Sequence, residues 1–275
     1  MNYETLQFEV RDHIGWLTLN RPASYNALTM TMIEELRDFF GALEDNLDTR
    51  VIVIRGAGKS FCAGLDLMEP PGYEDGGTMD SGVSSRFRPK GFAIPRKLSD
   101  VVIRMRHCPQ PIIASIRGAT VGGGFGIAMA ADIRIVSDTA KFNVGAPRIG
   151  FSGGDVGISY FLPRQVGAAR AALYMFTSRS IDAVTAERIG LVSLVVPDDQ
   201  LDQATEDMTL ELARISPFAL RMTKEVYNAG IDAASLADAT KLENRTQILC
   251  SFTSDSVEAI KASFIEKRAP VYTDE

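Results

Sequence analysis

The chain has 275 residues, of which 45% are hydrophobic, and its formal net charge at pH 7 is −6. This length and apolar content predict one large domain, or one domain with a tail. The acidic balance argues against a nucleic-acid-binding surface, and no apolar run reaches the length that spans a membrane. The N-terminal residues lack a basic segment followed by an apolar one, and three widely spaced cysteines suit a reducing compartment. We therefore expect a cytoplasmic protein.

The first part of the chain predicts a hairpin, a helix and a strand. Leu6–Leu19 has the pattern of a β-hairpin with its turn at Asp12-His13. Thr31-x-x-Glu34 predicts a capping box at the start of a helix. Apolar residues then recur at helical spacing and predict one buried face: Met32, Ile33, Leu36, Phe39, Phe40 and Leu43. Val51–Ile54 is a short β-branched run, typical of a buried strand.

Glycines and prolines crowd residues 68–85, which predicts a mobile loop. Five basic residues follow with no acid before Asp100: Arg86, Arg88, Lys90, Arg96 and Lys97. Such a run is usually a solvated face, although it would also attract phosphates to the mouth of a pocket. Leu98–Met105 then predicts a helix that ends before Pro109.

The stretch from Gln110 to Asp132 organises the rest of the chain. It begins with a buried strand over 112–116, and Gly118 ends that strand. The turn Gly122–Gly124 then leads into an apolar helix, Phe125–Ala131. A glycine turn before a buried helix presents free backbone N–H groups to an anion or to a developing oxyanion. A tight turn without a ligand is the alternative.

The remainder alternates short strands and helices and then becomes helical. Expected strands at Ile133–Val136 and Ala140–Val144 precede a turn from Gly145 to Asp155, and a helix is expected from Asp155 to Leu162. A helix and a strand follow within 181–197. The helices expected after them are Leu201–Ala213, Pro217–Asn228, Leu236–Phe252 and Ser256–Lys267.

Several other catalytic motifs are excluded by spacing. The glycines do not form the G-x-G-x-x-G of a dinucleotide site, and Gly58-Lys59-Ser60 lacks the first glycine of a Walker A loop. Gly150-x-Ser152-x-Gly154 matches a nucleophile elbow, but that fold places its histidine after the serine. Both histidines, His13 and His107, precede Ser152 and are too isolated for a zinc site.

A second loop carries a family resemblance. Phe61-Cys62-Ala63-Gly64-Leu65-Asp66-Leu67 follows the Val51–Ile54 strand. Together with Gly122–Gly124 it resembles the crotonase (enoyl-CoA hydratase/isomerase) superfamily, and the resemblance extends from about Glu9 to Tyr272. In that family each loop donates one backbone N–H to the thioester oxygen of an acyl-CoA. The resemblance implies that Leu65 and Gly123 are the donors, and that CoA enters as part of the substrate with no separate cofactor or metal.

The resemblance also implies the architecture. The fold is expected to be α/β, a ββα superhelix over residues 1–198 followed by a helical region over 199–275 that forms trimers or dimers of trimers. The first CoA-binding loop corresponds to Tyr25, Asn26 and Ala27, although many relatives have a basic residue in place of Tyr25. The other substrate-binding residues implied are Ala63, Gly64, Asp66, Leu67, Gly122, Gly126, Ala146 and Gly154.

The family's hydratases carry two glutamates that share the proton transfers. By position these correspond to Gly126 and Ala146, whose separation of 146 − 126 = 20 residues matches the family spacing. Neither side chain can move a proton. Asp155 lies in the turn where the family's dienoyl-CoA isomerases and 4-chlorobenzoyl-CoA dehalogenases place a catalytic aspartate. Asp155 is therefore a candidate acid or base, and a helix N-cap is the alternative.

Three hypotheses follow for the function. The first is an acyl-CoA enzyme that stabilises a thioester enolate and uses Asp155 or bound water. The second is a protein of the same fold that binds acyl-CoA without turning it over. The third is an unrelated α/β protein in which the loops occur by chance. Binding of CoA separates the third hypothesis from the others, and turnover separates the first from the second.

Overall fold

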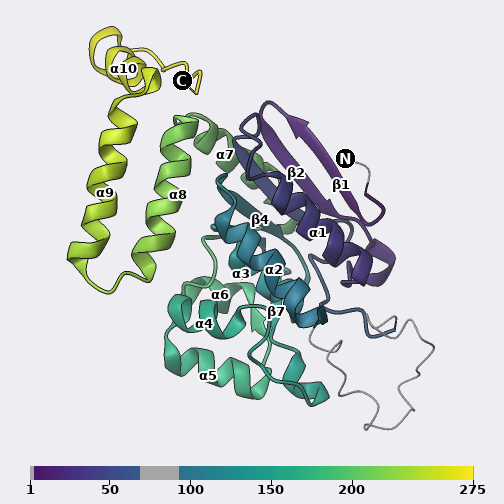
Figure 1. Ribbon diagram of the computed structural model, residues 1–275. Coiled ribbons are helices and arrows are strands. Elements are labelled where there is room, and N and C mark those ends of the chain that lie inside the picture. The colour runs from purple at the N-terminus through teal and green to yellow at the C-terminus, as the bar shows by residue number, and fades with distance from the viewer. Residues whose placement is uncertain (1–2, 69–92, 275) are drawn as a thin grey trace.

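A computed structural model describes residues 3–68 and 93–274 of the chain (Figure 1). Most of the loop expected at 68–85 lies outside the described residues, as do Arg86, Arg88 and Lys90 of the basic run. Lys97 lies within them, and its ammonium group forms an ion pair with Glu34.

Six strands form the main sheet, in the order β1-β2-β3-β4-β6-β9. The first two strands form the expected antiparallel hairpin, which turns at Asp12 and His13, both with positive φ. Every later neighbour in this sheet is parallel. The strands are β1 (Leu6–Arg11), β2 (Ile14–Leu19), β3 (Val51–Gly56), β4 (Ile112–Ile116), β6 (Ile133–Ser137) and β9 (Leu194–Val196).

A second sheet contains β5 (Ala119–Val121), β7 (Lys141–Asn143) and β8 (Ile181–Asp182). An isolated bridge between Cys62 and Thr120 adds the loop after β3 to this sheet. The order β4-β5-α3 and then β6-β7-α4 gives one strand to each sheet before each helix. The chain therefore winds forward in ββα turns.

The central strands β2, β3 and β4 of the main sheet are buried on both faces, which explains their continuous apolar sequences. Successive side chains of β3 point to opposite sides, so Ile52 and Ile54 belong to one core cluster and Val51 and Val53 to another. The larger cluster includes residues of α1 (Met30–Ala42), α2 (Ala93–His107) and α3 (Gly123–Ala130). The smaller cluster is covered by α7 (Leu201–Ala213).

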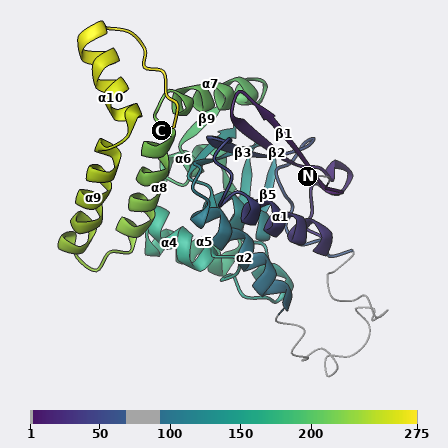
Figure 2. The same ribbon diagram turned by 45° about the horizontal axis from the view of Figure 1, so that its top comes forward.

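The remaining helices form a lobe and an arm (Figures 1 and 2). The lobe contains α4 (Ile158–Val166), α5 (Ala168–Thr177) and α6 (Ala183–Arg188). The arm contains α8 (Pro217–Ile231), α9 (Leu236–Ser251) and α10 (Ser254–Ile260), which continues as a π-helical turn, Lys261–Glu266. Short 3-10 turns lie at Pro22–Ser24, Ala146–Ile149 and Asp198–Gln200. In both views α9 lies along α8 on the side away from the sheet.

The structure corrects two expected helix caps. The cap of α1 is Thr29, whose Oγ1 accepts a hydrogen bond from the Met32 N–H at 3.2 Å, and not Thr31. Glu34 is therefore free to pair with Arg37 and Lys97. Asp155 does not cap α4, because the helix begins at Ile158 and Gly157 occupies the N-cap position.

Ion pairs and main-chain carbonyls hold the arm to the core. The buried Lys224 ammonium on α8 donates hydrogen bonds to the carbonyls of Met105 and Gln110, at 3.1 and 2.8 Å, and pairs with Asp132 at 2.9 Å. These contacts satisfy a cation that would be costly to bury alone. The helix that begins the arm is thus anchored beside α2 and β4.

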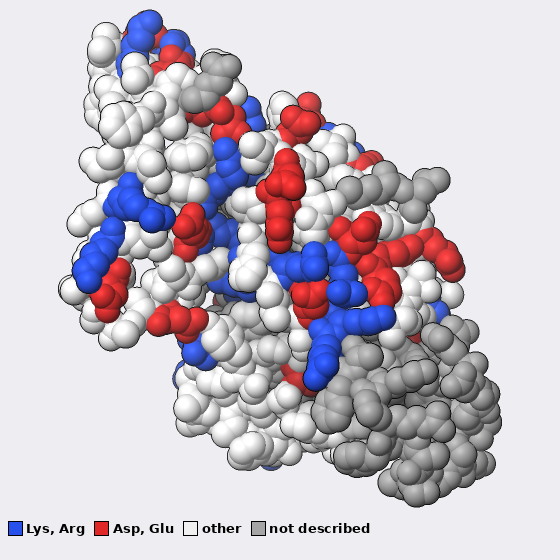
Figure 3. Space-filling model, in the orientation of Figure 1, with Lys and Arg blue, Asp and Glu red and all other residues white. Residues whose placement is uncertain are grey.

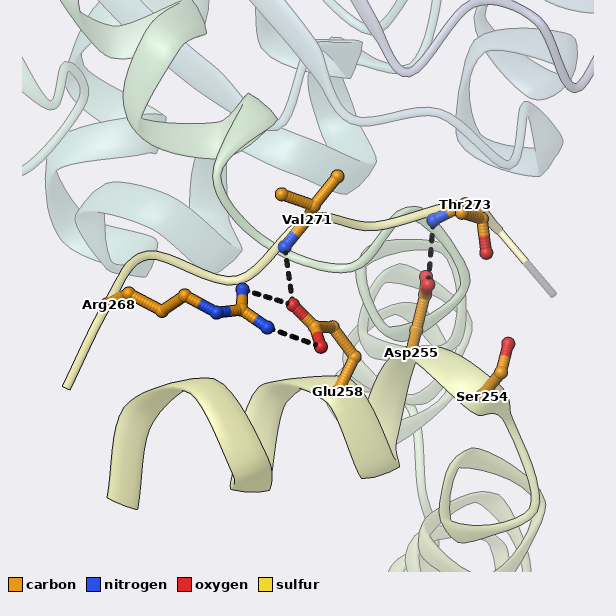
Figure 4. A pocket seen from close by; sticks show the side chains of 6 residues that line it. All are labelled: Ser254, Asp255, Glu258, Arg268, Val271 and Thr273. Carbon is orange, nitrogen blue, oxygen red and sulfur yellow. Dashed lines mark hydrogen bonds and ion pairs between the residues drawn. The ribbon is translucent and has the colours of Figure 1, made fainter. Parts of the chain in front are cut away.

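The C-terminal tail folds back over α10 (Figure 4). Glu258 accepts two hydrogen bonds from Arg268, at 2.6 and 3.0 Å, and these bonds lower the pKa of its carboxyl to about 2. The buried Asp255 carboxylate accepts the Thr273 N–H at 2.8 Å. Asp274 then pairs with Arg221 of α8, so the tail closes the arm onto itself.

Figure 3 shows basic and acidic side chains intermixed in a band across the middle of one face, whereas the lobe below is nearly uncharged on that face. Exposed apolar side chains also mark this lobe and the turn before it: Ile149, Phe151, Leu173 and Phe176.

Within the described ranges, no helix combines the length and apolarity that crossing a bilayer requires.

Candidate active site

Two glycine loops meet in front of α3. Residues after β3 run parallel to β5, since the Cys62 N–H donates to the Ala119 carbonyl and the Val121 N–H to the Cys62 carbonyl, at 3.1 and 2.9 Å. A Cβ placed on Gly64 would lie 2.9 Å from the Val121 carbonyl oxygen. A Cβ placed on Gly122 would lie 4.0 Å from the Gly64 Cα. Both glycines have positive φ, so a larger residue would be strained at either position, and at Gly64 it would also push the loops apart.

Each loop has a backbone N–H that finds no acceptor among the described residues. Leu28 bonds to the groups on either side of Leu65, at the Gly64 carbonyl and the Asp66 N–H, so the Leu65 N–H points away from Leu28. Gly123 is the first residue of α3, where the N–H has no intrahelical partner. In the described part of the chain, neither of these two N–H groups donates a hydrogen bond. Both are therefore available to a ligand oxygen.

The helix behind the loops is held firmly at its other end. All eight residues of α3 are buried. At its C-terminus the Arg134 guanidinium donates to the Ala131 carbonyl at 2.6 Å and to the Leu191 carbonyl at 2.8 Å. Burial lowers the pKa of Arg134 to about 10, and a cation at this end opposes the negative pole of the helix. Nothing in the sequence pattern singled out Arg134.

Asn26 joins the first loop to the second. Its side chain is fully buried, accepts the Arg21 N–H at 2.9 Å and donates to the carbonyls of Ala57 and Ser60 at 2.9 and 2.8 Å. Tyr25 is exposed, has positive φ, and its carbonyl accepts the Ala63 N–H at 3.0 Å. The structure therefore gives Asn26 a loop-tying role and leaves the Tyr25 side chain at the surface.

Asp66 also serves the loop itself. Its carboxylate pairs with the Arg21 guanidinium at 2.9 Å and accepts the Met68 N–H at 3.0 Å. The same guanidinium donates to the Ala27 carbonyl at 2.7 Å. Arg21 thus connects two segments 45 residues apart, a role that the sequence did not reveal. Leu67, next in the chain, is exposed.

Gly126 lies in the first turn of α3, and Ala146 lies in the turn that follows β7. A Cβ on Gly126 would lie 2.5 Å from the Val156 carbonyl oxygen, so the turn 153–157 packs directly on α3. Ala146 begins a 3-10 turn after Gly145. A Cβ on Gly145 would lie 3.8 Å from the Gly122 nitrogen, which brings this second turn beside the glycine loops.

Asp155 extends from the turn that packs on Gly126. Its Oδ1 accepts the Val156 N–H at 2.9 Å, and no ion pair of Asp155 occurs among the residues described. Surrounding atoms desolvate the carboxylate and raise its pKa, and the Val156 N–H opposes this effect. Asp155 is nevertheless an exposed residue, so the desolvation of its carboxylate is incomplete. Gly154, its neighbour, donates its N–H to Ser152 Oγ at 3.1 Å.

In the part of the chain that the structure describes, no three His, Cys, Asp or Glu side chains are grouped so that they could hold a metal ion. Among the described residues, the two loops instead offer backbone N–H donors, and the turn that packs on α3 offers the Asp155 carboxylate, which has no ion pair there. That combination can stabilise an oxyanion and move a proton.

Known proteins are similar to this chain in sequence and in fold. Residues 9–275 match the family described as Enoyl-CoA hydratase/isomerase. A "Probable enoyl-CoA hydratase" of Mycobacterium bovis is 35% identical over 96% of this chain and 91% of its own length. Crystal structures of an enoyl-CoA hydratase from Bacillus anthracis and of a probable enoyl-CoA hydratase/isomerase from Mycobacterium abscessus match with TM-scores of 0.88 and 0.86. They are 29% and 32% identical, over 99% of this chain and 100% of each of theirs.

The expected α/β crotonase fold with C-terminal helices is therefore confirmed. The chain belongs to the enoyl-CoA hydratase/isomerase family.

Proposed function

We propose that this protein binds an acyl-CoA thioester and stabilises its enolate in an oxyanion hole made by the backbone N–H groups of Leu65 and Gly123. The observation that carries the proposal is a pair of N–H groups, on two glycine loops in close contact, that have no acceptor among the described residues. Donors aimed at a developing negative charge lower the barrier without having to reorganise. Family membership supports an acyl-CoA substrate.

We also propose the substrate-binding residues that the family resemblance implies. CoA would lie along the backbone of Tyr25–Ala27, and the acyl group would enter between the loop 63–67 and the turn at Gly122. Asn26 and Asp66 would act by holding these loops in shape, since their side chains already have protein partners. Gly126, Ala146 and Gly154 would line the side of the site where the proton moves.

Asp155 is the acid or base that we propose for this proton. The names of the relatives point to hydration, but on the proposed equivalence the two glutamates of a hydratase are replaced by Gly126 and Ala146. The pKa of Asp155 is raised and the carboxylate has no counter-ion among the described residues, and both features are typical of a catalytic carboxylate. A non-catalytic acyl-CoA-binding protein is the alternative function.

Asp155→Asn tests the role. Asparagine can accept the same Val156 N–H bond, so the turn should stay intact while the charge is lost. If Asp155 is the base, turnover should fall by about 10²–10⁴. The unaltered protein should lose kcat/KM as the pH falls through the raised pKa of Asp155, because the base is then protonated, and the variant should lack that limb.

Stability provides the control for this variant. A raised carboxyl pKa means that the folded state binds this proton more tightly than the unfolded state, so stability falls as the pH rises between the two pKa values. Removing the charge should therefore not destabilise the protein at neutral pH. Turnover that survives in a folded Asp155→Asn variant would exclude the proposed role.

The protein should bind CoA thioesters more tightly than the corresponding free acids, because the free acid lacks the CoA portion and the contacts that it would make along Tyr25–Ala27. Isothermal titration calorimetry with CoA and several acyl-CoAs measures this difference. Absence of binding up to about millimolar concentration, roughly −4 kcal/mol, would contradict the proposal. Binding without turnover would favour the alternative.

We also propose that the chain divides into a core, 1–198, and a helical region, 199–275, that forms a trimer or a dimer of trimers. The arm exposes apolar side chains that a second copy can cover: Leu236, Ile248, Leu249 and Phe252. Light scattering after gel filtration should give three or six times the chain mass of 29.9 kDa. A clean monomer would contradict it.

A further inference from the structure

Val156 adopts a conformation that its residue type disfavours. Its φ is +48°, in the left-handed region, although a β-branched side chain is crowded there. The next residue, Gly157, also has positive φ, at +77°. A glycine at 156 would adopt this conformation freely. The presence of valine indicates that its side chain supplies something that offsets the backbone cost.

The Val156 side chain is seated on α3. It is 2% exposed, and a Cβ placed on Gly126 would lie 2.8 Å from both its Cβ and its Cγ1. Gly126 in turn belongs to the first turn of α3, where its N–H donates to the Gly122 carbonyl at 3.0 Å. Valine at 156 and glycine at 126 are thus a matched pair, since a side chain at 126 would displace the turn.

The backbone of Val156 is hydrogen-bonded to the side chain of Asp155. The Val156 N–H donates to the Asp155 Oδ1 at 2.9 Å, and the Ile158 N–H donates to the Asp155 carbonyl at 2.8 Å. The carboxylate is therefore folded back onto the backbone of the residue that rests on α3. A movement of Val156 would carry the carboxylate with it.

We propose that Val156 is a positioning residue, which sets the place of the Asp155 carboxylate relative to the first turn of α3 through its contact with Gly126. The proposal rests on the proposed function, in which Asp155 exchanges a proton and Gly123 begins the oxyanion hole. Val156 itself does not touch the substrate. It acts by keeping the distance between the proton-transfer group and the oxyanion donor constant.

The test compares Val156→Gly with Val156→Thr. Glycine removes the backbone strain at position 156 and also the side chain that packs on Gly126, whereas threonine keeps a branched side chain of similar shape. We expect Val156→Gly to lower kcat by about 10²-fold, the cost of displacing a catalytic group by about 1 Å, with KM unchanged. Val156→Thr should keep most of the activity. Val156→Ala is the second variant if glycine prevents folding, because it keeps Cβ and loses both γ-methyl groups, and it should also lower kcat.

A second measurement is independent of turnover. NMR titration of the Asp155 carboxyl in the ligand-free protein should show its pKa falling toward the ordinary value of about 3.9 in Val156→Gly, and staying raised in Val156→Thr. Wild-type kcat and wild-type pKa in a folded Val156→Gly variant would overturn the proposal. An equal loss in Val156→Thr would overturn it as well. A shifted pKa together with full activity in Asp155→Asn would support the positioning and refute the proposed function.

Discussion

Replacing Gly123 by proline is expected to lower turnover of the acyl-CoA substrate by about 10²–10³, the usual effect of losing one oxyanion donor. Proline has no backbone N–H, so the variant loses the donor that Gly123 presents at the start of α3. The first position of a helix is also where proline is best tolerated, because its fixed φ suits the helix. The loss should therefore come mainly from the missing donor.

Gly123→Ala is the matched control. A Cβ at this position would lie 2.8 Å from Leu28 Cδ1 and 3.1 Å from Leu98 Cδ2, so both variants have to displace the same two side-chain ends. Alanine keeps the N–H, and the ratio of kcat/KM between the two variants isolates the donor. Thermal unfolding checks that both are folded. Equal activity of the alanine and proline variants would remove Gly123 from the oxyanion hole.

The elements that the sequence predicted well are those with a local cause. The hairpin turn at Asp12-His13 and the apolar face of α1 follow from patterns that span a few residues. The first cap was misplaced because Thr29 and Thr31 both suit an N-cap. Thr29 takes the position, since the helix begins at Met30 and the Thr29 side chain reaches the Met32 N–H.

The positions of the two glycine loops could also be predicted, because glycine allows the positive φ and the close backbone approach that the structure shows there, and their catalytic role stays a prediction. The partners of Asn26 and Asp66 could not, since Ser60 and Arg21 lie 34 and 45 residues away in the chain. Asp155 was expected at a helix start because aspartate favours that place. The left-handed conformation of Val156, which delays the helix to Ile158, depends on a contact with α3 that no local pattern encodes.

Hydration of crotonyl-CoA is expected to be slower than in a family hydratase that carries both glutamates by at least about 10⁴, because each positioned acid or base contributes roughly 10²–10⁴. Addition of water to an enoyl thioester needs a base for the water and an acid for the α-carbon. On the proposed equivalence Gly126 and Ala146 occupy the positions of these two groups, and neither side chain can accept or donate a proton. The proposed oxyanion hole is unaffected, so an enolate should still form with Asp155 as the proposed acid or base.

The packing of α3 also predicts that adding the two glutamates back will not restore hydration. A glutamate at 126 would place its Cβ 2.5 Å from the Val156 carbonyl oxygen, a main-chain atom that cannot turn aside as a side chain can. Gly126→Glu combined with Ala146→Glu is therefore not expected to restore hydration, because the turn that holds Asp155 occupies the space. The rate is measured from the loss of absorbance of the conjugated thioester, with isomerisation of the same substrates followed in parallel. Hydration at an ordinary hydratase rate by the unaltered protein would show that Gly126 and Ala146 do not stand where the two glutamates act.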